Sequence, residues 1–220
     1  MFLYPRSQKS DRYSTIATKP IKIMSDLVNP LASIIQQASQ LPDLGIAANY
    51  KQRLGSGNPE IFCLLLDTSG SMISDCKGKE TRIDVLRKAV KSLDWQFYQM
   101  FTFDNLCRKI SSPDALLGCC GGSTNLALGL REIAKLNPCK TILISDGEPN
   151  SEEDALAAAK ELTGTISTVF IGDDEDKNAI AFMRKLATLG CGSTFVRDLG
   201  KGHMELSATI ERLILPPSRS

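Results

Sequence analysis

The sequence predicts an α/β fold: a doubly wound, mostly parallel central sheet flanked by helices on both faces, with one short antiparallel edge strand. Two observations lead to this prediction. From about residue 60, short apolar runs alternate with stretches whose apolar residues recur every three or four positions. The run Ile-Phe-Cys-Leu-Leu-Leu at 61–66 does not alternate with polar residues. Such a run is typical of a strand that is buried on both faces in the middle of a parallel sheet.

The first strand is expected at 60–66, and a helix follows at 81–93, where apolar residues recur at helical spacing. The stretch 95–103 is rich in aromatic residues and alternates in part, which indicates a second strand. A short edge strand at 106–110 pairs with it in antiparallel fashion, with Asp104-Asn105 as the hairpin turn. This hairpin supplies the one antiparallel pair of the predicted sheet.

The second half of the chain continues the alternation. A helix at 126–136 ends before Asn137-Pro138, because proline disfavours helical geometry in the residue that precedes it. The remaining elements are strands at 140–145, 165–171 and 193–197 and helices at 151–162, 177–189 and 203–214. Strands that are joined through helices form a parallel sheet with right-handed crossovers, so helices are expected on both of its faces.

Composition narrows the possible classes of protein. The 220 residues suffice for one α/β domain plus an arm, and 42% hydrophobic with 23% charged residues is ordinary for a globular protein. A net charge of +1 argues against a nucleic-acid-binding face, and no apolar run is long enough for a membrane span. The seven cysteines form no Cys-x-x-Cys pair, and the start of the chain lacks the apolar stretch of a secretory signal. We therefore expect a cytoplasmic protein.

The sequence divides into three parts. Residues 1–23 carry five basic residues and one acidic residue and are expected to form a flexible arm, although Met24 is also a possible natural start. Residues 24–58 are expected to contain an amphipathic helix, at 25–40, and a linker. This helix either docks on the domain or binds a partner. Residues 59–216 are expected to form the α/β domain.

Oxygen-bearing side chains gather where predicted strands and loops end. Asp67, Ser69 and Ser71 follow the first buried strand, Thr124 follows a glycine-rich loop, and Asp146 follows the strand at 140–145. The carboxyl ends of parallel strands meet at one edge of a sheet, where open α/β folds bind their ligands. Carboxylate and hydroxyl oxygens without sulfur or imidazole suit a hard cation, Mg²⁺ or Mn²⁺. The alternative is that these residues only form turns and cap helices.

The pattern Asp-x-Ser-x-Ser, a later Thr and an Asp-Gly after another strand resembles the von Willebrand factor A (VWA) domain over about residues 60–200. The resemblance implies a Rossmann-like VWA fold with a metal-ion-dependent adhesion site. In that site Ser69, Ser71 and Thr124 would provide hydroxyl oxygens, and Asp67 and Asp146 would bind the ion directly or through water. Secondary matches are Thr81-Arg82-Ile83-Asp84, which opens a helix, and Phe101-Thr102-Phe103-Asp104, which ends a strand.

The resemblance also implies a function: a partner protein supplies a Glu or Asp carboxylate that completes the coordination of the ion. We therefore expect an interaction module and not an enzyme, acting as an intracellular adaptor in a larger assembly, for example with an AAA+ ATPase or a signalling system. Two alternatives stay open at this point. One is a structural or adhesive component of a virus particle or surface fibre, and the other is a metal-dependent hydrolase. The sequence does not specify the partner or the oligomeric state.

Overall fold

The computed structural model of the chain describes residues 57–75, 80–116, 121–197 and 203–214. The predictions of a basic arm at 1–23 and of an amphipathic helix at 25–40 lie outside the described residues and stay predictions.

The described residues form a six-stranded sheet with the strand order β3-β2-β1-β4-β5-β6. Strand β3 runs antiparallel to β2, and the other neighbouring strands are parallel. The predicted fold class, with its single antiparallel edge strand, is therefore confirmed. The strands are β1 (Asn58–Asp67), β2 (Tyr98–Phe103), β3 (Cys107–Ile110), β4 (Pro138–Ser145), β5 (Thr165–Phe170) and β6 (Cys191–Val196).

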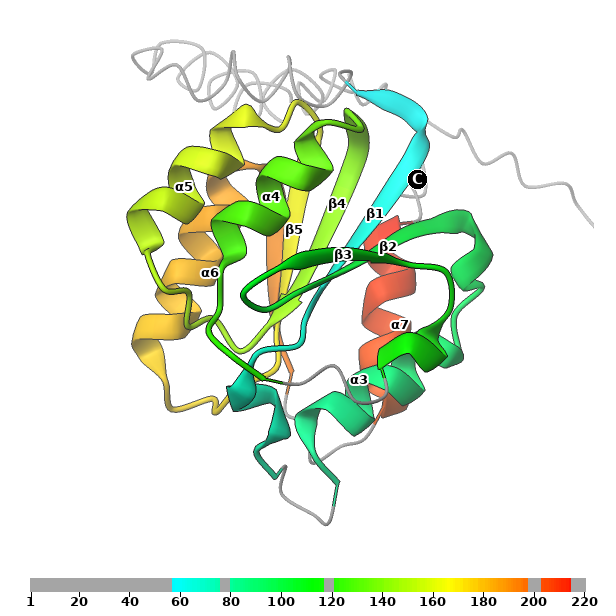
Figure 1. The fold of residues 1–220 in the computed structure, drawn as a ribbon, viewed down its shortest axis with the longest axis vertical. Helices are drawn as coiled ribbons and strands as arrows, with labels where there is room; N and C mark the ends of the chain where they lie inside the picture. The colour runs from blue at the N-terminus through cyan, green and yellow to red at the C-terminus, as the bar shows by residue number, and fades with distance from the viewer. Residues whose placement is uncertain (1–56, 76–79, 117–120, 198–202, 215–220) are drawn as a thin grey trace, which may run out of the picture. The chain divides into compact units, whose positions relative to one another are not determined.

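Helices cover both faces of the sheet, with α4, α5 and α6 on one face and α3 and α7 on the other (Figure 1). The helices are α3 (Arg82–Lys91), α4 (Leu126–Ala134), α5 (Glu152–Glu161), α6 (Lys177–Leu189) and α7 (His203–Ile214), with short 3₁₀ helices η1 (Gly70–Ile73), η2 (Trp95–Phe97) and η3 (Pro113–Leu116). No helix in this described part of the chain has the length and apolar character that crossing a membrane requires.

The position of β1 in the middle of the sheet explains why its sequence is continuously apolar. Leu65 belongs to the buried cluster under α4, α5 and α6, whereas Leu64 and Leu66 belong to the cluster under α3 and α7. All three leucines are fully buried, so each contributes roughly 1.5–3 kcal/mol by removing its side chain from water. Both faces of β1 lie in the core, and only its end reaches solvent-facing loops.

Several predicted boundaries differ from the structure by two or three residues, and two of these differences have a clear local cause. The predicted strand at 95–103 begins only at Tyr98, because Trp95–Phe97 forms a 3₁₀ turn in which Phe97 donates its N–H to the Asp94 carbonyl at 3.2 Å. Strand β4 begins at Pro138, two residues before its predicted start, directly after Asn137 with a φ of 52°. Proline is tolerated there because it is the first residue of the strand.

Candidate metal centre

The predicted ligands lie at the carboxyl ends of β1 and β4, which are adjacent parallel strands in the middle of the sheet. The connection that leaves β1 forms α3 on one face of the sheet, and the connection that enters β4 forms α4 on the other face (Figure 1). The order of the strands therefore reverses its direction between β1 and β4. Open α/β sheets leave a crevice for ligands at such a point, because the connecting helices lie on opposite faces.

Asp67 is the last residue of β1 and is fully buried. Its Oδ1 accepts a hydrogen bond from the backbone N–H of Ser69 at 2.8 Å, and its Oδ2 accepts one from the hydroxyl of Ser145 at 2.6 Å. Burial, and after it the negative charge of Asp146, raises the pKa of Asp67 to about 6, although these hydrogen bonds act in the opposite direction. The carboxylate is thus held in one orientation, close to a second acidic group.

Ser69 and Ser71 present their hydroxyls to each other, with 3.1 Å between the two Oγ atoms. Ser69 precedes η1, but its side chain makes no capping hydrogen bond to that helix. The capping alternative for this motif therefore does not describe Ser69. Both residues follow Asp67 in the same loop, and the role of their hydroxyls as neutral oxygen ligands stays a prediction.

Backbone hydrogen bonds tie the glycine-rich loop to the loop after β1. Gly70 donates its N–H to the Gly122 carbonyl at 3.3 Å, and Gly121 donates to the Thr68 carbonyl at 3.2 Å. Gly122 has a φ of 81°, a conformation that favours glycine, and a Cβ there would collide with the Asn105 amide. These contacts bring the segment that carries the next predicted ligand beside Ser69 and Ser71.

That ligand, Thr124, is buried and is held by Asn150. The Thr124 N–H donates to Asn150 Oδ1 at 2.8 Å, and the Asn150 N–H donates to the Thr124 carbonyl at 2.9 Å. The cap of α4 is Asn125, whose side chain accepts from Leu128 N, so Thr124 does not cap this helix either. Because Asn150 lies in the loop that begins with Asp146, this pair joins the second and third ligand segments.

Asp146 is 3% exposed, and its two oxygens differ. Oδ2 accepts from Arg82 Nη1 at 3.0 Å, whereas Oδ1 is buried without a hydrogen-bond partner among the described residues. Because an orphaned carboxylate oxygen is costly in a protein interior, it needs a physical reason. Carboxylate and hydroxyl oxygens at the same crevice suit Mg²⁺ or Mn²⁺. The residues present thus fit a hard divalent cation, and their role as its ligands stays a prediction.

Three residues of this site were not predicted as part of it: Ser145, which orients Asp67; Arg82, which pairs with Asp146; and Asn150, which holds Thr124. Ser145 stood in the sequence directly before Asp146, so its place at the strand end was the only available signal. The position of Asn150, four residues after Asp146, is compatible with a residue at the rim of the site or with one that caps the following helix, and it does not indicate Thr124 as its partner. Nothing in the sequence pattern indicated that Arg82 would reach Asp146, 64 residues away.

The secondary matches have structural roles. Thr81 and Asp84 form a capping box at the start of α3: Asp84 N donates to Thr81 Oγ1 and Thr81 N donates to Asp84 Oδ2. Asp104 is buried, but its Oδ1 accepts from Leu106 N at 2.7 Å and its Oδ2 accepts from Arg108 at 2.9 Å. Both oxygens of Asp104 are therefore used within the β2–β3 hairpin, in contrast to those of Asp146.

Comparison with known proteins identifies the fold. No protein-family model matches the sequence, and no curated protein sequence matches it. The structure is similar to that of the manganese-loaded TRAP protein of Plasmodium vivax, with a TM-score of 0.51 and 22% identity over 72% of this chain and 74% of that one. It is also similar to the SpRpn10 VWA domain, with a TM-score of 0.50 and 16% identity over 70% of this chain and 95% of that one. The chain has the VWA fold, as the sequence pattern predicted.

Proposed function

We propose that this domain is a divalent-metal-dependent protein-interaction module with Mg²⁺ or Mn²⁺ as its ion. Five residues would hold the ion: Asp67, Ser69, Ser71, Thr124 and Asp146. The observation that carries the proposal is the buried Oδ1 of Asp146, which has no hydrogen-bond partner in the described part of the chain, at the same edge of the sheet as the fully buried Asp67. Similarity to a VWA-fold structure that is manganese-loaded supports a divalent ion.

When bound, such an ion supplies positive charge and an exchangeable coordination position to a carboxylate. The three hydroxyl ligands are neutral, so they add oxygen atoms without cancelling that charge. Asp67 is fixed by the hydrogen bond that it accepts from Ser145, which keeps its oxygens in place before binding. The partner is therefore a protein that presents a Glu or Asp side chain.

The module is a binding protein and not an enzyme, because both carboxylates are used to hold the ion and neither is left to act as the base that metal-assisted hydrolysis needs. The setting that we propose is an intracellular adaptor in the cytoplasm, docking on a larger assembly such as an AAA+ ATPase or a signalling complex. The expectation of a protein partner agrees with the VWA fold of both similar structures. A nucleic-acid partner is disfavoured by the net charge of +1.

Calorimetric titration with Mn²⁺ tests the metal centre. Asp67→Ala and Asp146→Ala should each weaken Mn²⁺ binding by more than about 100-fold, because even the outer groups that orient metal ligands contribute roughly 10–100-fold. Asp104→Asn is the matched control: it removes a buried carboxylate charge at the same sheet edge, where both oxygens already have partners. Unchanged affinity in the two alanine variants would show that these residues do not hold the ion. Metal-dependent capture of proteins from native lysate, with Asp67→Ala as negative control, then identifies the partner.

A further inference from the structure

The only cation paired with Asp146 among the described residues is Arg82, the first residue of α3. We propose that Arg82 is the resident counter-ion of the metal-free site and that it competes with the divalent ion for Asp146, which lowers the affinity of the site for metal. This inference rests on the proposed function, since it concerns the same metal centre.

The charges of the site support this competition. Asp67 and Asp146 are both buried, so the metal-free protein must keep a carboxylate pair away from water. The Arg82 guanidinium lies 3.0 Å from Asp146 Oδ2 and offsets one of these charges. A divalent ion at the same carboxylates would face a positive group a few ångströms away, in a crevice where solvent screens little. The Arg82–Asp146 ion pair and the bound divalent ion therefore stabilise two alternative states of Asp146.

The position of Arg82 allows it to yield without disturbing the fold. Its backbone is fixed, since its N–H donates to the Ser74 carbonyl at 3.1 Å and the capping box of Thr81 and Asp84 fixes the helix start. Its side chain is 21% exposed, and within the described residues its contact with the carboxylate is made by Nη1. A long side chain with one such contact and access to water can swing outwards while α3 stays in place.

A different role for Arg82 would have the opposite effect on metal binding. If the ion pair served only to orient Asp146 for the metal, loss of Arg82 would weaken binding, as it does for groups that position a ligand. Under competition, loss of Arg82 strengthens binding, because the ion no longer displaces a favourable pair. The sign of the change in affinity separates the two roles.

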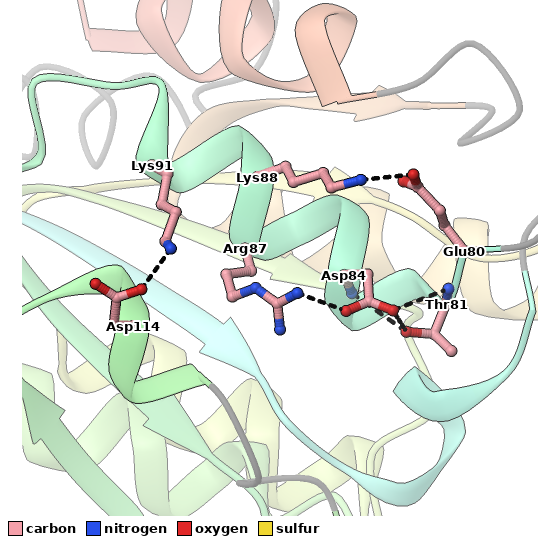
Figure 2. Close-up of polar contacts among 7 residues, drawn as sticks. All are labelled: Glu80, Thr81, Asp84, Arg87, Lys88, Lys91 and Asp114. Atoms are coloured by element: carbon pink, nitrogen blue, oxygen red, sulfur yellow. Dashed lines mark hydrogen bonds and ion pairs between the residues drawn. The ribbon is translucent and has the colours of Figure 1, made fainter.

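The control residue lies on the same helix. Arg87 pairs with Asp84 at 2.7 Å through one nitrogen, and its side chain is 19% exposed, close to the 21% of Arg82 (Figure 2). This pair belongs to the polar contacts along α3 and does not involve Asp67 or Asp146. Arg87→Gln therefore removes the same charge from an arginine of similar exposure, five residues along the helix from Arg82, where the carboxylate partner is 35% exposed in place of 2%.

The experiment is a calorimetric titration of the wild type, Arg82→Gln, Arg82→Lys and Arg87→Gln with Mn²⁺. We expect R82Q to bind Mn²⁺ about 10-fold more tightly, in the usual range for coupled binding events. R82K, which keeps the charge, and R87Q should stay near the wild-type affinity. Should R82Q fail to fold, Arg82→Met, which retains an apolar stem, provides the same comparison.

Weaker or unchanged Mn²⁺ binding in R82Q, with normal binding by the wild type, would overturn the competition and leave the metal centre intact. Absence of Mn²⁺ binding in every variant would overturn both the competition and the proposed function. Binding by R82Q alone would support the competition, and it would show that the wild-type site is blocked by its own arginine.

Discussion

Asp67 is a carboxylate that the fold holds where water cannot solvate it. Its side chain is fully buried, and both oxygens accept hydrogen bonds from groups of the sheet edge. These bonds favour the ionised form, but burial and the neighbouring Asp146 outweigh them, so the pKa is raised to about 6. In the metal-free protein this residue is therefore a source of instability at neutral pH, which a bound cation would relieve.

The pH dependence of stability follows from this pKa. The folded-state pKa of about 6 lies above 3.8, the ordinary value of an aspartate, so the folded state binds the proton more tightly than the unfolded state. The stabilisation by this proton is fully present below about pH 3.8 and is lost as the pH rises through 6. In EDTA, the stability of Asp67→Asn relative to wild type should therefore increase between pH 4 and pH 7, by roughly 2–3 kcal/mol.

Urea denaturation of both proteins in EDTA at several pH values measures this difference. Asp104→Asn is again the control, because Asp104 is a buried carboxylate with an arginine partner. A stability difference between Asp67→Asn and wild type that does not vary with pH would mean that Asp67 is not held as a poorly solvated carboxylate.

At the scale of residues, the side chains that directly follow a strand could be predicted from the sequence. The side chains that reach the strand end from other segments could not. Asp67 and Asp146 could be predicted because each directly follows an apolar run, and the topology makes such positions converge. Arg82 could not be predicted, because its contact depends on the angle at which α3 leaves the loop after η1. Asn150 was ambiguous for a related reason: its two bonds to Thr124 exist only once two loops are folded together.

At the scale of elements, the start of α3 matters most for the site, because it sets the backbone position of Arg82. Thr81 and Asp84 form reciprocal hydrogen bonds around this first turn, and Arg87 further fixes Asp84 (Figure 2). A capping box satisfies backbone N–H groups that otherwise lack partners at a helix start. The sequence at the start of α3 thus affects the geometry of the site, because the capping box holds the helix start to which Arg82 belongs.

Thr81→Val should reduce the free energy of unfolding by about 1 kcal/mol, the typical value of a lost N-cap. Valine has a similar shape but cannot accept from Asp84 N or donate to Asp84 Oδ2. Asp176→Ala, which removes the N-cap of α6, should cost a similar amount. Equal stability of Thr81→Val and wild type in chemical denaturation would show that the box contributes nothing.

Helix and strand identities could be predicted more securely than their ends. The spacing of apolar residues in α3 and α6 reflects a face that packs on the sheet, and this pattern is visible in the sequence. The start of β2 was misplaced because aromatic residues favour strands, while Trp95 packs beside the core under α3 and α7 from within a 3₁₀ turn. The packing of Trp95 and the hydrogen bond to the Asp94 carbonyl determine where the strand begins, and neither can be predicted from the spacing of apolar residues.

At the scale of the whole molecule, the sheet order explains how distant segments form one site. Strands β1 and β4 are neighbours in the sheet, although 70 residues lie between Asp67 and Pro138 in the chain and include α3, the β2–β3 hairpin and α4. The doubly wound arrangement could be predicted because alternating strands and helices have few ways to pack. The location of the candidate site at the carboxyl ends of the strands then follows from the fold itself. The balance between its acidic and basic groups depends on individual side chains.

Because the proposed ion binds the folded site and not the unfolded chain, it should raise the thermal stability of the whole domain. At a free Mn²⁺ concentration 100 times the dissociation constant, the stabilisation is about 2.7 kcal/mol. For a chain of this size that corresponds to a rise in Tm of roughly 5–10 °C, which EDTA should abolish. Asp146→Ala should show no rise, because it lacks the carboxylate whose Oδ1 has no hydrogen-bond partner among the described residues. An equal rise in Asp146→Ala would place the stabilising ion elsewhere, and the acidic stretch at 173–176 would then be the next segment to mutate.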